Sequence, residues 1–402
     1  MTDNNNNNGN NILVFSHEQD VDGLLSAAVL KMAHPNSEVV LTNYGFENMV
    51  AIREKIFSFT QQNQQQGQQS GSLGEGRIII ADIGVNEEGH NPVFEALAVS
   101  KQRGFSNMWI DHHPWPEEMK DKFSKVCKLV LYSSENEGEI RQDDGVTSKK
   151  MCATELCIEQ FALDNPYAKT LGSIAHRTDF PDSARFPIPP LTGLISYYLG
   201  KKELNQKLYS VILENIVRGV LWNIEMQDDM IEASRLIDES IARSLETMTT
   251  HEFKFTPYSS DNTLLSSGRE RKVRVAIVKA DSFVSRSMLL GRIMDSSSSN
   301  GELKTTIDLA IAYTSDGRLS IRRNNSVPEN TLQLDCGKIA ATFREGGGHP
   351  SAAGGFLKTN VKRNGDDNAV IIEIESTLQN YLEQLEQQYD RQLSENNNYF
   401  SK

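Results

Sequence analysis

The chain has 402 residues, enough for about two domains, and its 38% hydrophobic and 24% charged residues are typical of a folded protein. A formal net charge of −13 excludes a protein that coats nucleic acid through its overall field, so a bound polyanion must meet a local basic or metal-lined site. No segment approaches the roughly 20 apolar residues that cross a bilayer, and the N-terminus has no signal pattern. We therefore expect a cytoplasmic protein without membrane association.

The first half of the chain predicts strands and helices that alternate. Residues 1–11 are mostly asparagine and are expected to form a disordered tail. Short apolar runs predict buried strands, with helices between them, and the strands are expected at 12–15, 39–41, 78–81 and 108–110. Because these strands are apolar without alternation, we expect a parallel sheet covered on both faces. Residues 60–76, rich in Gln, Asn, Gly and Ser, are expected to be a solvated insertion.

The second half predicts a helical region and then another mixed region. Helices are expected at 147–162, 164–178 and 203–249. Strands are expected at 273–278, 307–313 and 319–322, followed by a glycine-rich loop at 346–348 and an acidic, Gln-rich C-terminal helix. The predicted fold class is thus α/β, and we divide the chain into a parallel-sheet catalytic domain at 12–200, a helical connector at 201–260, a smaller α/β domain at 261–360, and a C-terminal helix and tail at 361–402.

The four cysteines argue against a thiolate metal site. They form no CxxC pair and no spacing typical of zinc ligands, and they stand at Cys127, Cys152, Cys157 and Cys336. In a chain of this length we expect them to be small buried side chains in a reducing compartment.

Polar side chains follow three of the predicted strands. The candidates are His17, Asp20 and Asp22 after the first strand, Asp82 after the third, Asp111, His112 and His113 after the fourth, and Asp179 at the end of a helical segment. Ligands bind at the carboxyl ends of parallel strands, so these side chains should meet at one edge of the sheet. A single Asp after a strand is often a helix cap or turn residue, and paired histidines are often incidental. Their joint occurrence is what favours a site.

A cluster of carboxylates this dense predicts bound cations. Bare carboxylates at close range would repel one another, and divalent ions remove that repulsion. Carboxylate and imidazole ligands without thiolate favour Mn²⁺, with Mg²⁺ or Co²⁺ as alternatives, over structural zinc. We expect two divalent ions about 4 Å apart that share one carboxylate, activate a water and hold a phosphate for in-line attack.

Four segments resemble the motifs of the DHH phosphoesterase family. They are SHEQDVDGLLSAA, IIIADIG, WIDHHPW and HRTDF, and the resemblance extends from about residue 12 to residue 360. It implies a metal-dependent phosphoesterase in which Asp82 bridges two metal ions. One ion would be held by Asp20 and Asp82, and the other by Asp22, Asp82, His112 and Asp179.

The resemblance also implies roles for three further residues. His113 would face the substrate phosphate, and Asp111 would orient a histidine, so these two are the catalytic candidates. His17 stands three residues before Asp20, whereas some family members carry a histidine four residues before it, where this chain has Ser16. His17, three residues before Asp20, is therefore the candidate metal ligand from this segment.

The segment GGGHPSAAGG suggests a second, substrate-binding site. Gly346, Gly347 and Gly348 would expose backbone N–H groups to a phosphate or sugar, and His349 would add a donor. Arg322 could clamp a phosphate with its guanidinium group. A glycine run is often only a flexible loop, and an exposed arginine is often only solvated. Together, however, they resemble the DHH-associated C-terminal domain, which implies nucleotide substrates rather than inorganic pyrophosphate.

The functional expectation is hydrolysis of phosphodiester bonds in short oligonucleotides or single-stranded nucleic acid ends, as by an exonuclease or oligoribonuclease. Alternatives within the enzyme class are a 3′,5′-bisphosphate nucleotide phosphatase and a cyclic dinucleotide phosphodiesterase. A catalytically dead replication scaffold is a further alternative, although such a protein would be expected to have lost acidic ligands that this chain retains. The expected partners are nucleotides, oligonucleotides or single-stranded ends, with a homodimer as one option for assembly.

Overall fold

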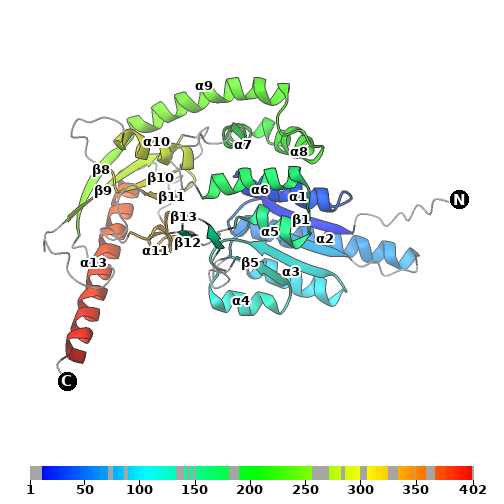
Figure 1. Cartoon of the computed structure of the whole chain (residues 1–402), viewed down its shortest axis with the longest axis horizontal. Helices are drawn as coiled ribbons and strands as arrows, with labels where there is room; N and C mark the ends of the chain where they lie inside the picture. The colour runs from blue at the N-terminus through cyan, green and yellow to red at the C-terminus, as the bar shows by residue number, and fades with distance from the viewer. Residues whose placement is uncertain are drawn as a thin grey trace. The chain divides into compact units, whose positions relative to one another are not determined.

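The computed structural model describes most of the chain. The described residues are 11–70, 76–85, 89–132, 140–142, 145–147, 151–180, 190–255, 271–281, 286–298, 306–324, 334–348, 350–358 and 367–400. The chain divides into two compact units, Met1–Ser234 and Arg235–Lys402, which we call unit 1 and unit 2 (Figure 1). The division falls inside the helix α9 (Ile224–Glu246).

Unit 1 is built on a five-stranded parallel sheet. Its strands are β1 (Ile12–His17), β2 (Glu38–Thr42), β3 (Arg77–Ala81), β4 (Ser106–Asp111) and β5 (Lys128–Leu131). Their order in the sheet is β2-β1-β3-β4-β5, and every neighbouring pair is parallel. The first four strands appear where the apolar runs predict them, which confirms a parallel sheet in the first half of the chain.

Helices cover both faces of this sheet, as the non-alternating strands predict. One face packs against α2 (Phe46–Ser70), α3 (Asn91–Gln102) and α4 (Glu117–Ser124) in a cluster that contains Phe15, Ile80 and Trp109. The other face carries α1 (Val21–Ala33), which packs against β1, α5 (Ala153–Gln160) and α6 (Pro166–Asp179). Figure 1 shows these two helix layers on opposite sides of β1.

The solvated insertion expected at residues 60–76 is helical in its first part, because α2 continues as far as Ser70. Glutamine is a good helix former, so the segment can extend an amphipathic helix without being buried itself. The start of this extension is anchored: Thr60 is buried, and its Oγ1 accepts a hydrogen bond of 2.8 Å from Arg103 Nη1. Residues 71–75 lie outside the described residues.

The prediction of a single helix over 203–249 is also wrong. After α7 (Pro190–Gly200), the chain forms several shorter elements instead. They are a 3₁₀ turn (Lys202–Leu204), a π-helical turn (Leu208–Leu213) and α8 (Glu214–Val217), followed by α9 and the strand β8 (Thr249–Phe255). Gly219, with φ of 86°, takes a left-handed conformation that ends α8. The Asn223 side chain then accepts a hydrogen bond from the Met226 N–H and caps α9. Local capping signals therefore override the apolar periodicity.

Earlier in unit 1, the expected helix over 147–162 is shorter than predicted. Residues 140–142 and 145–147 pair as the antiparallel strands β6 (Ile140–Gln142) and β7 (Gly145–Thr147), and helix α5 begins only at Ala153.

Unit 2 contains a six-stranded mixed sheet in the order β12-β13-β11-β10-β9-β8. Besides β8, its strands are β9 (Arg271–Lys279), β10 (Leu309–Tyr313), β11 (Arg318–Arg323), β12 (Arg344–Gly348) and β13 (Ala352–Phe356). Only β9 and β10 pair in parallel. With unit 1, this second sheet makes the chain a two-domain α/β protein, as expected.

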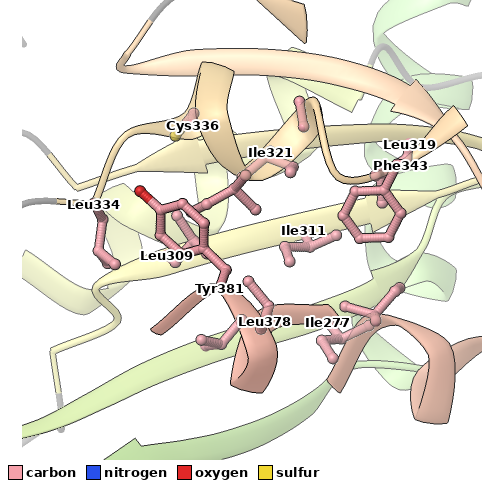
Figure 2. Close-up of a cluster of buried hydrophobic side chains, with 14 of the residues drawn as sticks. Ile277, Leu309, Ile311, Leu319, Ile321, Leu334, Cys336, Phe343, Leu378 and Tyr381 are labelled. Carbon is pink, nitrogen blue, oxygen red and sulfur yellow. The ribbon is translucent and has the colours of Figure 1, made fainter. Parts of the chain in front are cut away.

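One face of the second sheet forms the core of unit 2. Ile277, Ile311 and Ile321 on this face pack against α11 (Cys336–Ala340) and α13 (Asp367–Phe400), with Leu378 and Tyr381 supplied by α13 (Figure 2). Helix α10 (Arg286–Ser298) packs against β10 and β11. All four cysteines are buried and free, and none of the described helices has the length and apolar character of a membrane span.

Candidate metal centre

The predicted polar residues of unit 1 meet at the carboxyl edge of its sheet. β1 ends at His17, Asp20 caps the N-terminus of α1, Asp82 directly follows β3, and β4 ends at Asp111. Asp179 is the last residue of α6. The side chains form three groups of donor atoms, each within 4.8 Å, which are His17–Asp20–Asp82, Asp22–His112–Asp179 and Asp82–His112–His113. These buried acidic and histidine clusters could hold metal ions.

Asp82 lies between the groups and points one carboxylate oxygen toward each side. Its Oδ2 is 3.8 Å from His17 Nδ1, and its Oδ1 is 3.3 Å from His112 Nε2. Neither oxygen accepts a well-formed hydrogen bond from the described residues, although the side chain is buried. Its backbone has φ of 55°, a left-handed conformation that few residues other than glycine, asparagine and aspartate adopt. Burial, and then the charges of Asp20 and Asp22, raise the pKa of Asp82 to about 6.

His17 and Asp20 form a tight pair beside Asp82. His17 Nδ1 lies 2.6 Å from Asp20 Oδ2, and the Gly23 N–H donates to Asp20 Oδ1 over 2.9 Å. Burial opposes charge on both groups, but their mutual attraction outweighs it, so the pKa of His17 is raised and the pKa of Asp20 is lowered. Gly23 is required here because a Cβ at this position would overlap the His17 carbonyl oxygen. The glycine of the Asp-x-Asp-Gly sequence thus permits close packing.

Asp22 is held by the N-terminus of α5. Its two carboxylate oxygens accept hydrogen bonds from the Ala153 N–H at 2.7 Å, the Thr154 N–H at 2.8 Å and the Thr154 hydroxyl at 2.6 Å. A helix N-terminus favours negative charge, so α5 stabilises the carboxylate and fixes its direction. Asp22 Oδ2 also lies 3.6 Å from His112 Nε2.

His112 and Asp179 complete this side of the cluster. His112 Nε2 lies 3.3 Å from Asp179 Oδ2. Burial would lower the pKa of His112, but Asp82, Asp179 and Asp22 raise it above its ordinary value. The pKa of Asp179 is raised by burial and by the charge of Asp22. In the metal-free protein these groups therefore hold protons that a metal ion would have to displace.

Asp111 has a different environment, because donors surround it. His113 Nδ1 lies 2.7 Å from Oδ1, which also accepts the His112 N–H at 3.0 Å, and Trp115 Nε1 donates to Oδ2 over 2.6 Å. Burial would raise the pKa of Asp111, but His113 and the other donors lower it. Its oxygens are thus occupied, and the contact with Nδ1 fixes the orientation of the His113 ring. This arrangement is compatible with the expectation that Asp111 orients a histidine.

Sequence reasoning missed three residues of this centre. Thr154 stands 132 positions after its partner Asp22, and no local signal marks it. Trp115, in the segment WIDHHPW, packs against Trp109 and also donates from Nε1 to Asp111. Tyr44, just beyond the end of β2, places its ring edge-on to His17 with centroids 4.7 Å apart, and its hydroxyl accepts the Gly84 N–H at 3.4 Å.

In unit 2, the predicted glycine loop is a strand instead. Gly346, Gly347 and Gly348 belong to β12, which pairs with β13. A Cβ on Gly346 would overlap the Ala340 carbonyl oxygen, and Gly348 has φ of 137°, so close packing explains these two glycines. A Cβ on Gly347 would meet nothing within 4 Å. His349 lies outside the described residues.

Arg322 and the glycine run lie close together in the sheet of unit 2. Arg322 on β11 pairs with Ala352, and Gly348 on β12 pairs with the adjacent Ala353. Two strands that flank β13 therefore bring these expected substrate-binding residues to the same end of one sheet.

Comparisons with known proteins reveal distant structural likeness. No family model and no curated protein matches the chain. An uncharacterized protein from Helicobacter pylori G27 has 16% identity over 93% of this chain and 99% of its own, with a TM-score of 0.35. An exopolyphosphatase-related protein from Bacteroides fragilis has 13% identity over 93% of each chain, with a TM-score of 0.45. A pGpG-specific phosphodiesterase from Vibrio cholerae has 11% identity over 91% of this chain and 99% of its own, with a TM-score of 0.40.

Proposed function

We propose that this chain is a metal-dependent phosphoesterase that uses two divalent ions, Mn²⁺ in the first instance, to hydrolyse phosphodiester bonds of short oligonucleotides or single-stranded nucleic acid ends. The observation that carries the proposal is the position of Asp82. Its two oxygens face two different groups of donor atoms, and neither accepts a well-formed hydrogen bond from the described residues. A buried carboxylate in this state is costly unless cations compensate its charge.

The donor set fits such ions. It contains only carboxylate oxygens and imidazole nitrogens, the ligands that suit Mn²⁺ and related ions, and no cysteine belongs to any of the three groups. When bound, two such ions lower the pKa of a water and offset the negative charge of the reacting phosphate. Asp82 would join the two ion sites, with His17 and Asp20 on one side and Asp22, His112 and Asp179 on the other.

The other residues of the centre would hold the substrate. His113 is oriented by Asp111 through the contact at Nδ1, so Nε2 is the nitrogen that would meet a phosphate oxygen. Asp111 is in turn held by the Trp115 Nε1–H and the His112 N–H, which would keep the His113 ring in one position during the reaction. In unit 2, Arg322 and the glycines of β12 would bind the nucleotide.

The test is hydrolysis by the purified full chain after metal removal and after addition of defined ions. Substrates would be end-labelled RNA and DNA oligonucleotides, dinucleotides, cyclic dinucleotides and 3′,5′-bisphosphate nucleotides, which separates the leading activity from its alternatives. We expect no hydrolysis in chelator and recovery with Mn²⁺, greater than with Ca²⁺. Full activity in excess chelator would reject the metal mechanism, and inactivity on all substrates with Mn²⁺ would reject the enzyme.

A further inference from the structure

Tyr44 lies at the candidate metal centre, yet the proposed reaction gives it no role. It stands two residues beyond the end of β2, the strand next to β1, and so at the same carboxyl edge as His17. Its ring is edge-on to His17, with centroids 4.7 Å apart, and edge-on to His113, with centroids 6.4 Å apart. The ring therefore faces two histidines that belong to different groups of donor atoms.

Hydrogen bonds on both sides fix the backbone of Tyr44. Its N–H donates to Asn43 Oδ1 over 2.8 Å, and its carbonyl oxygen accepts from Asn48 Nδ2 over 2.8 Å. Asn43 is itself buried. The next residue, Gly45, has φ of 105°, a left-handed conformation that turns the chain into α2. This turn holds the Tyr44 side chain in one direction, toward the two histidines.

The Tyr44 hydroxyl is anchored through its oxygen. The oxygen accepts the Gly84 N–H at 3.4 Å. Gly84 lies directly against His113, because a Cβ on Gly84 would be 3.1 Å from the His113 Cβ. A phenol both accepts and donates hydrogen bonds, and among the described residues no acceptor takes the hydrogen of this hydroxyl. Tyr44 therefore offers a neutral donor close to His113.

Solvent reaches the centre on the side where Tyr44 lies. The side chains of His17, Asp82 and His112 are at most 7% exposed. By contrast, the Asp20 side chain is 43% exposed and the His113 side chain is 24% exposed. Tyr44 is also partly exposed, and its ring faces both His113 and the histidine that pairs with Asp20. A phosphate that enters from this side would meet the Tyr44 hydroxyl as well as His113.

We propose that the Tyr44 hydroxyl donates a hydrogen bond to an oxygen of the reacting phosphate, beside His113. The proposal rests on the proposed function, which assigns that phosphate to the metal centre. The negative charge of a phosphate strengthens a hydrogen bond from a neutral donor. His113 follows β4 and Tyr44 follows β2, so the two donors would reach the phosphate from different strands and fix its orientation as well as its position.

The experiment separates the hydroxyl from the ring. Calorimetry on the full chain measures its affinity for Mn²⁺ and then the affinity of the Mn²⁺-loaded protein for inorganic phosphate. Tyr44→Phe keeps the ring beside His17 and removes only the hydroxyl. We expect unchanged Mn²⁺ affinity and a loss of about ten- to a hundredfold in phosphate affinity, the range for one hydrogen bond to a charged group. Wild-type phosphate affinity in this variant would overturn the proposal, and so would an equal loss of Mn²⁺ affinity, because Tyr44 would then support the ions.

A second tyrosine of unit 1 provides the matched control. The Tyr167 hydroxyl donates to the Ile216 carbonyl oxygen over 2.8 Å, so Tyr167→Phe removes the same atom away from the three groups of donor atoms. It should leave phosphate affinity unchanged, and a loss as large as that of Tyr44→Phe would overturn the proposal.

Hydrolysis distinguishes this proposal from the proposed function. If the wild type binds Mn²⁺ and phosphate but hydrolyses none of the substrates named above, the hydrolase is rejected, while a phosphate loss confined to Tyr44→Phe still supports the contact. If the wild type hydrolyses them and Tyr44→Phe does so with the same kcat and KM, the hydrolase stands and the role of Tyr44 is rejected.

Discussion

The carboxyl edge of the sheet in unit 1 and the arginine-bearing face of the sheet in unit 2 present opposite electrostatic problems. At the first, Asp20, Asp22, Asp82 and Asp179 crowd around three histidines. At the second, the charges of Arg286 and Arg318 lie near Asp316, which pairs with Arg318 at 3.2 Å. Each arrangement costs free energy in the isolated protein, since like charges lie close together in partly buried positions.

The difference between the two regions indicates what each would bind. The acidic edge favours cations, and its donors are held by buried neighbours such as Thr154 and Trp115. The face of the unit 2 sheet that carries Arg318 favours an anion, and the paired glycines Gly347 and Gly354 leave backbone rather than side chain on it. The predictions that follow test each half of this comparison.

The largest effect is expected at Asp82. Asp82→Asn removes the charge that both groups of donor atoms share, so it should lower Mn²⁺-dependent hydrolysis by more than the roughly 10- to 100-fold typical of residues that only support a ligand. His17→Ala should cost less, because His17 belongs to one group only. Asp121→Asn, an exposed change on α4, is the matched control and should be neutral. Steady-state kinetics measures all three, and comparable small losses in Asp82→Asn and His17→Ala would place the site elsewhere.

The next effect concerns metal and pH. Free Mn²⁺ at about 100 times its Kd should raise the free energy of unfolding by about 2.7 kcal/mol. Asp82, Asp179, His17 and His112 have raised pKa values, so their contribution to the stability of the metal-free protein is present at low pH and is lost as pH rises. For Asp82 the loss falls between pH 3.8 and about 6, and for the histidines it falls above 6.5.

Because metal ions displace these protons, the stabilisation by Mn²⁺ should grow with pH. Thermal unfolding of the chelated and the Mn²⁺-loaded protein at pH 5.5 and pH 7.5 measures it. A stabilisation that is equal at the two pH values, or larger at the lower one, would show that these groups are not the ligands.

A smaller effect is expected where α5 supports Asp22. Thr154→Val keeps the side-chain shape but removes the hydroxyl donor, so Mn²⁺ affinity should fall by about 10- to 100-fold. Thr154→Ser restores the donor and should recover most of the affinity. Calorimetric titration of metal-free protein separates this effect from catalysis. Wild-type affinity in the valine variant would mean that the backbone N–H groups of Ala153 and Thr154 alone hold Asp22.

The smallest effect compares two glycines of β12. Gly346→Ala would force a Cβ against the Ala340 carbonyl oxygen and should destabilise the protein by about 1–3 kcal/mol. Gly347→Ala meets open space and should change stability by less than about 0.5 kcal/mol. Urea unfolding measures both. If the two variants are equally stable, packing does not account for Gly346, and its role is with the substrate.

The sequence alone determined the sheet of unit 1 and the residues at its edge. Apolar runs mark β1, β3 and β4, and the polar side chains directly after a strand must lie at its carboxyl end. Hence Asp82, Asp111 and His112 could be placed before the structure was known. The same reasoning did not predict that α2 continues into the Gln-rich segment, because a glutamine side chain can be solvated while its backbone is helical.

The packing of the folded chain determines which residues hold these side chains in place. The contact between Thr154 and Asp22 joins positions 132 residues apart, and the attachment of Arg286 to Ser320 joins a helix to a neighbouring strand. The glycines of β12 likewise depend on how closely α11 and β13 approach their backbone. Periodicity and turn chemistry act over a few residues, whereas these contacts depend on the packing of whole elements, which no local pattern encodes.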